Sequence, residues 1–344
     1  MYEQIYDYEN LYKAHCLARR GKRDDSEVME FELNLATEIY KIQYELKHQI
    51  YRLKPYKEFT IYDPKERQIH ALHYRDRVVQ HSLCDNIIAP YMERHLIYDN
   101  ATSRKGKGTH FAMGRLNGFL QEFYKEHGNK GFLMKFDVRK YYDNIDHDIL
   151  KGIYKNAFGY DRKLYELLEQ IIDSYQVEEG KGIPLGNQTS QWFALSYLDG
   201  LDRLIKEQLH IKYYSRYMDD GVLIHESREY LRECKKQMEE YLKKERNMEF
   251  NEKTQIVPMA QGVDYLGFHF YLTENGKVIR RLRTSNKKRM KRKLKNFKRA
   301  YANGNITQEA VKRSLVSYSG HLSHGHTYHL RKRLLSNLVL RRKK

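Results

Sequence analysis

Two adjacent acidic residues, Asp219 and Asp220, interrupt a stretch of the chain that otherwise favours β-structure. Tyr213 and Tyr214 precede them and residues 222–224 follow, a pattern typical of two strands joined by a tight turn. Neighbouring carboxylates repel each other, so such a turn is unfavourable unless a cation lies close to it. Divalent metal ions are the usual partners of clustered Asp oxygens in phosphoryl and nucleotidyl transfer. The stretch therefore predicts a hairpin that presents acids at the edge of a sheet; a solvated surface turn is the alternative.

Positive charge is concentrated at the end of the chain. The formal net charge is +18, and residues 280–344 contain 21 Lys and Arg against one acid, Glu309. Basic and acidic side chains nearly balance over residues 1–279. Solvated helix faces usually mix signs, whereas a one-sided run is typical of polyanion binding. Because Met290, Leu294 and Phe297 recur at nearly helical spacing, we expect a folded basic helical lobe that binds nucleic acid, not a disordered tail.

Cysteine usage and hydropathy limit the class of protein. Cys16, Cys84 and Cys234 are widely separated and form no Cys-x-x-Cys pair, which favours reduced thiols in a cytoplasm-like compartment and argues against a zinc module. The first residues show no apolar signal region, and no apolar run approaches the length that crosses a bilayer. We therefore expect no membrane association.

Local patterns predict a mixed set of helices and strands. Helices are expected within residues 1–54, 76–88, 147–175, 191–209 and 227–245, and strands at 59–61, 68–72, 132–138 and 255–271. The helix over 76–88 is expected to stop at Pro90, and a turn at Pro64 and Lys65 is expected to join the first two strands. Since βαβ alternation is irregular, the pattern favours the α+β class over a doubly wound sheet.

A third carboxylate, Asp137, ends the apolar strand candidate and lies far ahead of Asp219 in the chain. Carboxylates on two strands can converge on two metals about 3.5–4 Å apart, one activating an attacking hydroxyl and one holding the leaving group. Alone, Asp137 would more commonly cap a helix or form a salt bridge. Together with Asp219 and Asp220, it favours a catalytic interpretation.

At this point the sequence resembles the reverse transcriptases, in matching order over roughly residues 55–330. Asp137 followed by Tyr141 and Tyr142 resembles the first metal-binding motif, and residues 217–220 resemble the second. The resemblance implies a right-hand polymerase fold with fingers, a palm built on an antiparallel sheet, and a helical thumb. The expected divisions are N-terminal helices and fingers at 1–130, palm at 131–272 with a fingers segment at about 175–195, and basic thumb at 273–344.

The resemblance also implies the metal site. Asp137 and Asp219 match the principal ligands, Asp220 the supporting acid, and Val138 would add its backbone carbonyl. Two Mg²⁺ ions are implied, with Mn²⁺ as a substitute. Tyr142 matches the aromatic gate that excludes a ribose 2′-hydroxyl, so deoxynucleotides (dNTPs) are the expected substrates.

Several further positions match family motifs. Arg67 and Arg104 match the fingers cations that clamp the incoming triphosphate, a role that suits arginine geometry. Leu185 and Gly186 match positions at the bound nucleotide. Lys253 matches the lysine near the leaving pyrophosphate, a possible proton donor.

Tyr265, Leu266 and Gly267 resemble the primer grip, a tight apolar turn that seats the primer end; a buried strand with a glycine bulge is the plain alternative. The basic segment after Arg280 falls where a thumb grips the duplex through phosphates. Four histidines between residues 321 and 329 have no Cys or acid beside them. We interpret them as thumb surface or packing rather than as a metal site.

Residues 182–191 distinguish subfamilies. Most reverse transcriptases have Gln and Pro where this chain has Leu185 and Gln191. The pattern, with residues 198–203 and 317–321, resembles enzymes of diversity-generating retroelements, which copy a template-repeat RNA and misincorporate opposite adenine. Leu185 replaces an amide that could hydrogen-bond the nascent pair with a group that can only pack, which suggests looser control of base pairing.

The resemblance implies a set of partners. They are the template RNA, its duplex with DNA or primer, dNTPs, and a basic accessory (variability determinant) protein, in the cytoplasm of a bacterial or phage-infected cell. A retron, group II intron-like or phage-defence enzyme is the alternative within the class, although no Val-Thr-Gly signature of retrons is found. A catalytically silent RNA-binding protein is the alternative of another class, against which the intact acids argue.

Overall fold

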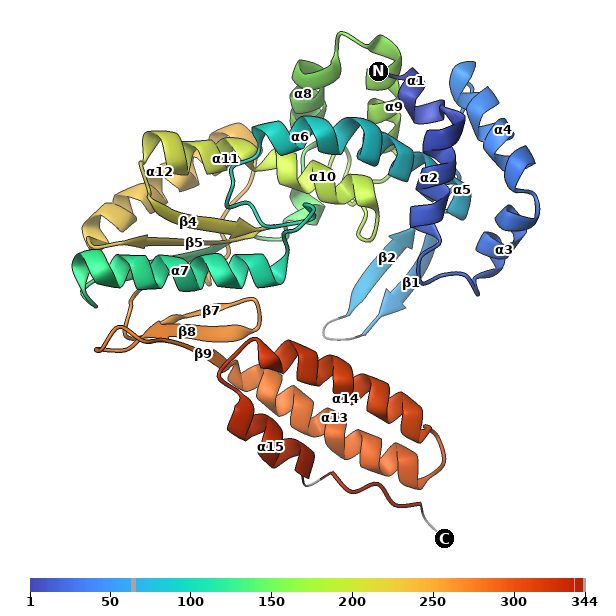
Figure 1. Cartoon of the computed structure of the whole chain (residues 1–344). Helices are drawn as coiled ribbons and strands as arrows, with labels where there is room; N and C mark the ends of the chain where they lie inside the picture. The colour runs from blue at the N-terminus through green and yellow to red at the C-terminus, as the bar shows by residue number, and fades with distance from the viewer. Residues whose placement is uncertain (63–65, 337, 343–344) are drawn as a thin grey trace. The chain divides into compact units, whose positions relative to one another are not determined.

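The computed structural model describes residues 1–62, 66–336 and 338–342, and shows the expected α+β protein (Figure 1). The chain forms two compact units. Unit 1 contains Met1–Lys105, Asp137–His210 and Cys234–Glu252, and unit 2 contains Gly106–Phe136, Ile211–Glu233 and Lys253–Lys344. The predicted three-part division at residues 131 and 273 stays a prediction.

Unit 1 is mainly helical. Its elements are α1 (Glu3–Tyr6), α2 (Tyr8–Ala18), α3 (Ser26–Leu33), α4 (Leu35–Lys47), β1 (Lys57–Ile61), β2 (Arg67–Ala71), α5 (Tyr74–Leu83), a π-turn (Cys84–Ile88), α6 (Ala89–His95), a 3₁₀ turn (Tyr142–Asn144), α8 (His147–Phe158), α9 (Arg162–Asp173), α10 (Gln188–Tyr197), α11 (Asp199–Arg203), a second π-turn (Leu204–Gln208) and most of α12 (Arg228–Arg246). The N-terminal helices pack around α5 through apolar faces; Ile39, Ile42 and Leu46 of α4 are fully buried. The turn predicted at Pro64 and Lys65 lies outside the described residues.

The helix expected to stop at Pro90 continues past it, so that prediction was wrong. A π-turn links α5 directly to α6, and Pro90 lies in the first turn of α6. The Ala89 N–H bonds to the Cys84 carbonyl in the π-turn, so the α-helical hydrogen-bond pattern is already interrupted where Pro90 lacks an N–H. The widened turn thus lets one nearly continuous helix run to His95.

The β1–β2 ribbon is a two-stranded antiparallel hairpin in which Phe59 pairs with Ile69 and Ile61 with Arg67. All five residues of β1 are exposed, and of β2 only His70 is buried. The ribbon therefore contributes little to the core of unit 1.

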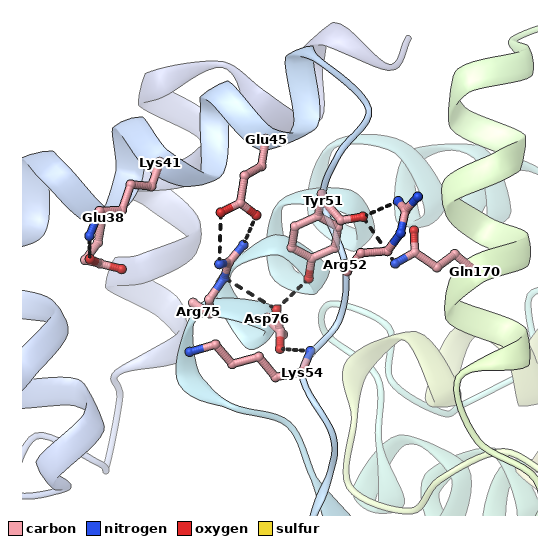
Figure 2. Close-up of polar contacts among 9 residues, drawn as sticks. All are labelled: Glu38, Lys41, Glu45, Tyr51, Arg52, Lys54, Arg75, Asp76 and Gln170. Atoms are coloured by element: carbon pink, nitrogen blue, oxygen red, sulfur yellow. Dashed lines mark hydrogen bonds and ion pairs between the residues drawn. The ribbon is translucent and has the colours of Figure 1, made fainter.

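A buried polar network fixes α5 against α4 and the segment that follows it (Figure 2). The guanidinium of Arg75 makes a two-point contact with the Glu45 carboxylate. Asp76 is fully buried and accepts hydrogen bonds from the Tyr51 hydroxyl at 2.7 Å and the Lys54 backbone N–H at 3.0 Å. Burial raises the pKa of Asp76. The carboxylates in this interior thus have partners, as buried polar groups require.

Unit 2 combines two small antiparallel sheets with helices. Its elements are α7 (Thr109–His127), β3 (Phe132–Asp137), β4 (Tyr213–Tyr217), β5 (Asp220–His225), β6 (Gln255–Pro258), β7 (Val263–Tyr265), β8 (Phe268–Leu272), β9 (Val278–Leu282), α13 (Thr284–Ala302), α14 (Gln308–Ser323) and α15 (Tyr328–Ser336). The first sheet has the order β4-β5-β3-β6, and α7 packs on β4 and β5 (Figure 1). The second has the order β7-β8-β9, of which β9 was not predicted.

The basic end of the chain is folded, as predicted. Helices α13, α14 and α15 share an apolar core in which Met290, Leu294, Phe297, Val311 and Leu322 are buried. The basic side chains of α13 fall between these positions and stay largely exposed. Burial of one face explains why a segment this highly charged forms ordered helices. In the part of the chain that the structure describes, no helix is both long and apolar enough to cross a membrane.

We predict that Asp76→Ala lowers the free energy of unfolding by about 3 kcal/mol, because the buried Tyr51 hydroxyl and the part-buried Lys54 N–H lose their acceptor. Urea denaturation followed by circular dichroism measures the change. The matched control is Lys41→Ala, which removes an exposed pair with Glu38 (2.8 Å) on α4 and should change stability by less than about 0.5 kcal/mol. Equal effects of the two substitutions would contradict the role of the buried network.

Candidate active site

The predicted hairpin is present, and its turn is short. Tyr217 pairs with Asp220, so the turn consists of Met218 and Asp219. Met218 has φ = 54°, and primed two-residue turns require positive φ at their first central position. A residue with a Cβ pays on the order of 1 kcal/mol for this conformation. These residues do not favour such a turn by themselves. The pairing of β4 with β5 therefore holds the turn, and with it Asp219, at the end of the sheet.

Arg216 supports this turn. Its side chain is fully buried in β4, and the guanidinium donates a hydrogen bond of 2.7 Å to the carbonyl of Met218. An internal arginine is costly unless its donors are used. Arg216 was not predicted from the sequence, although a cation two residues before the turn, in a strand of mainly aromatic residues, is a signal that could have indicated it.

A second cation lies beside the acids. The Lys135 Nζ is 3.0 Å from the Asp220 Oδ1, and the two side chains are 18% and 29% exposed. This ion pair lowers the repulsion between Asp220 and Asp219 that the sequence implied. Lys135 could not be predicted as part of the site from the sequence, because its contact depends on β3 lying next to β5.

The pairing of β3 with β5 also brings the third acid to this sheet. β3 ends at Asp137 and lies beside β5, which begins at Asp220. Side chains alternate along a strand, so Asp137 lies on the same face as Lys135. Contact between the two strands is close at Gly221, where a Cβ would lie 2.2 Å from the Phe136 ring. The acids predicted from the sequence thus occur on adjacent strands and on the turn beside them.

The chemistry of these groups fits a divalent metal, but the protein alone does not complete a metal site. Among the described residues, no three His, Cys, Asp or Glu side chains form a group that could hold an ion. Mg²⁺ is commonly held by one or two carboxylates, with substrate phosphates and water completing its coordination. Asp137 and Asp219 match this donor set, and Asp220 is engaged with Lys135.

Within unit 1, the residues after Asp137 are fixed by the backbone. The carbonyl of Asp137 accepts from the Asn251 N–H, and Val138 forms a β-bridge with Phe250. Tyr142 is half-buried, and its carbonyl accepts from the Ile183 N–H at 3.0 Å. These bonds attach the Tyr142 segment to the loop that contains Leu185.

That loop lies against the ribbon. Gly186 has φ = 107°, and a Cβ there would be 3.5 Å from the Ile69 side chain of β2. Leu185 is half-buried and Gly186 is exposed. Asn187 is buried, and its amide donates to the carbonyl of His70 at 3.4 Å. The loop thus holds its position by contacts with β2.

The two arginines expected in the fingers have different environments. Arg67 is exposed on β2. Arg104 is buried; its guanidinium pairs with Glu93 at 2.7 Å and donates to the carbonyls of Ile97 and Asn100. A phosphate could bind Arg104 only by competing with Glu93. Arg67 therefore fits the predicted contact more directly.

The segment predicted as a primer grip forms the two-residue turn of a β-hairpin, not a strand with a glycine bulge. Tyr265 pairs with Phe268, and both Leu266 (φ = 46°) and Gly267 (φ = 92°) have positive φ, as a type I′ turn requires. The Gly267 carbonyl accepts from the Arg283 N–H at 3.2 Å and the Asn286 side chain at 3.1 Å. These bonds connect the turn to the start of α13.

Lys253 is exposed and lies just before β6. The histidines near the end of the chain pack on their neighbours, in line with the packing interpretation. His321 contacts the ring of Phe268, His324 contacts the ring of His110, and His326 accepts from the Arg280 N–H at 3.0 Å.

Comparisons with known proteins agree with this architecture. A family model for reverse transcriptase (RNA-dependent DNA polymerase) matches residues 60–270. No curated protein matches the chain. Apo telomerase from Candida tropicalis has a similar structure, with a TM-score of 0.51, 14% identity, and coverage of 67% of this chain and 49% of that one. Telomerase from Candida albicans in complex with the TWJ fragment of telomeric RNA has a TM-score of 0.51, 13% identity, and coverage of 85% and 56%.

The chain thus spans about half the length of these two solved structures. At such identities the likeness concerns the fold alone. Together with the family model, it confirms the predicted α+β, right-hand polymerase fold.

We predict that Gly221→Ala destabilises the protein by about 1–3 kcal/mol, because the new methyl group would displace the Phe136 ring and separate β5 from β3. Chemical denaturation measures this change. Gly114→Ala on α7 is the control: it meets open space and should be neutral or stabilising by up to about 1 kcal/mol. A neutral result at Gly221 would disprove the close approach.

Proposed function

This chain belongs to the reverse transcriptase family, and on that premise we propose that it is an RNA-directed DNA polymerase that extends a primer with dNTPs on an RNA template. The observation that carries the proposal is the sheet order, which places the strand ending at Asp137 beside the strand that follows Asp219. A binding protein would gain nothing from acids clustered where nucleic acid phosphates must approach. The alternative of a silent RNA-binding scaffold is therefore disfavoured.

In this proposal Asp137 and Asp219, with the Val138 carbonyl, would hold two Mg²⁺ ions, or Mn²⁺ in their place. When bound, the ions would activate the primer 3′-hydroxyl and stabilise charge on the leaving pyrophosphate. Asp220 would act mainly through its ion pair with Lys135, which keeps the hairpin turn in place. Arg216 would fix the same turn through the Met218 carbonyl.

Further residues would bind the substrates. Tyr142, whose backbone is bonded to the Leu185 loop, would lie against the deoxyribose and exclude a 2′-hydroxyl. Arg67 is exposed and available to the triphosphate, whereas Arg104 would have to exchange Glu93 for phosphate. Lys253 would serve as proton donor to pyrophosphate.

The duplex would be bound by unit 2. The turn at Leu266 and Gly267 is bonded to α13, so a primer end seated on it would be coupled to the basic helices. The exposed Lys and Arg of α13 would bind the phosphates of the RNA–DNA or RNA–primer duplex.

We further propose that the enzyme serves a diversity-generating retroelement. The support is the sequence of residues 182–191, with Leu185 half-buried in a loop that is bonded to Tyr142 and packs on β2. Retron, group II intron-like and phage-defence enzymes are the alternatives. A basic accessory protein would bind the nearly neutral segment over residues 1–279 through charge, so high salt would dissociate it.

We predict that Asp219→Asn and Asp137→Asn each reduce Mg²⁺-dependent dTTP incorporation on a primed RNA template by at least about 10³-fold. Loss of a bound metal removes several kcal/mol of transition-state stabilisation, and each step of about 1.4 kcal/mol is tenfold in rate. RNA affinity, measured in parallel, should not fall. Wild-type protein that binds RNA tightly but incorporates nothing with Mg²⁺ or Mn²⁺ would support the silent scaffold instead.

We also predict that Leu185→Gln lowers misincorporation opposite template adenine by about three- to tenfold, the value of one added hydrogen bond. Sequencing of cDNA from a template with all four bases measures the error spectrum. Leu185→Met, which conserves size without adding a hydrogen bond, is the matched control. An unchanged spectrum in Leu185→Gln would refute the proposed role of this position.

A further inference from the structure

Three histidines lie together within unit 2, where the end of α14 meets the start of α7. The rings of His110 in α7 and His324, the residue that follows α14, have centroids 3.6 Å apart and an angle of 35° between their planes. His321, in the last turn of α14, packs on the Phe268 ring of β8 with centroids 5.0 Å apart. His110, His321 and His324 are called the histidine contact below; it joins the end of α14 to two other elements.

The histidine contact also reaches the turn at Leu266 and Gly267. The His321 Nε2 lies 3.4 Å, and its Cε1 3.6 Å, from the place where a Cβ on Gly267 would be. Gly325, just after α14, is close to the same hairpin: a Cβ there would lie 2.5 Å from the Phe268 ring. The turn is therefore held from two sides, by its bonds to α13 and by its packing on the end of α14.

The charged groups that face the histidine contact are cations. Arg289 of α13 opposes a proton on His321, and Arg280 of β9 opposes one on His324. The histidines oppose one another in the same way. Lys107 lies just before α7, and the first turn of α7 contains no acid. Among the described residues, none of the three rings forms an ion pair with a carboxylate.

Two features favour protonated rings, but they are outweighed. The carbonyl end of α14 attracts cations, as helix C-termini do. Asp264 is the acid of the β7–β8 hairpin, but it is engaged with His269 at 2.8 Å and with Arg283 at 2.9 Å. The pKa of His321 and that of His324 are nevertheless lowered, first by burial and then by the neighbouring histidines and arginines.

This arrangement makes the histidine contact sensitive to acid. Its closed form binds fewer protons than an open form in which the rings have the ordinary histidine pKa of about 6.5. The closed form is therefore fully favoured above about pH 6.5 and loses stability as the pH falls below that value. His110 and His321 are exposed and His324 is half-buried, so protons reach the rings directly from solvent. Two protonated rings at this separation would repel each other.

We infer that the histidine contact holds the end of α14, and with it the turn at Leu266 and Gly267, against the start of α7 only while its rings are neutral. Acid then releases the turn. The three histidines are positioning residues, since they act through the turn. The inference rests on the proposed function only in assigning the primer end to this turn; the contact itself stands on the packing of unit 2.

Hydrogen exchange followed by mass spectrometry tests the release on the full chain. EDTA is present, so that bound metal ions cannot cause the response. After correction for intrinsic rates, peptides that cover residues 262–272 and 316–326 should exchange about three- to tenfold faster at about pH 5.5 than at about pH 7.5, the effect of one histidine that protonates only in the open form. Peptides from α9 in unit 1 are the internal reference and should show no such difference.

Substitutions at one ring separate charge from packing. His110→Phe keeps a ring that cannot take up a proton, so the acid response should disappear while exchange at neutral pH stays slow. His110→Lys carries a permanent charge and should exchange fast at both pH values. His324→Phe repeats the first test from the α14 side, in case His110→Phe folds poorly.

The matched control is His329→Gln, which removes an exposed histidine of α15 in the same unit and should keep the wild-type response. A wild-type response in both Phe variants, or no acid response in the wild type, would overturn the inference.

Primer extension separates this inference from the proposed function. On acidification, the KM for primed template should rise about threefold more in the wild type than in His110→Phe, with the same change in kcat. If exchange shows the release but KM does not follow, the histidine contact stands and the primer end is not seated on this turn. If DNA is made but exchange shows no release, the contact is wrong and the polymerase stands. If no DNA is made while exchange behaves as expected, the contact stands and the polymerase is wrong.

Discussion

Repulsion between adjacent carboxylates is the constraint around which unit 2 is organised. Asp219 lies in a turn that requires a left-handed backbone conformation at Met218, and Asp220 begins the strand that follows this turn. The protein compensates with Lys135 on the next strand and with the buried Arg216 beneath the turn. The contact of Lys135 depends on the sheet order, since only a neighbour of β5 can supply it.

The close packing of β3 on β5 allows the ion pair between Lys135 and Asp220 to form. Gly221 has no side chain, so the Phe136 ring can lie where a Cβ would otherwise be. Close approach of β3 and β5 brings the Lys135 Nζ within 3.0 Å of the Asp220 carboxylate, and β3 ends two residues later, at Asp137. α7 covers β4 and β5 and excludes water from the apolar side of the hairpin.

Local features of the sequence predicted much of this arrangement, but features that depend on strand order or side-chain pairing could not be predicted. The hairpin and the basic helices follow from patterns within a few residues, namely β-favouring flanks and the spacing of Met290, Leu294 and Phe297. The role of Lys135 depends on which strands pair, and that of Arg104 on Glu93, a residue eleven positions earlier. The helix was wrongly predicted to stop at Pro90, because proline normally interrupts α-helical hydrogen bonding. The π-turn just before Pro90 changes that hydrogen-bond pattern, and the helix continues.

The exposed β1–β2 ribbon has a consequence for ligand affinity. An isolated two-stranded hairpin is at best marginally stable in water, and here one strand buries none of its side chains. Arg67 lies at the exposed end of β2, paired with Ile61 of β1, so a ligand that contacts Arg67 must also restrict the conformational freedom of this end of the ribbon. Part of its intrinsic binding free energy is consumed in this ordering, so net affinity is lower and dissociation faster than the contacts alone would give. For a protein that must release and rebind a ligand in each cycle, weak retention of this kind favours rapid turnover.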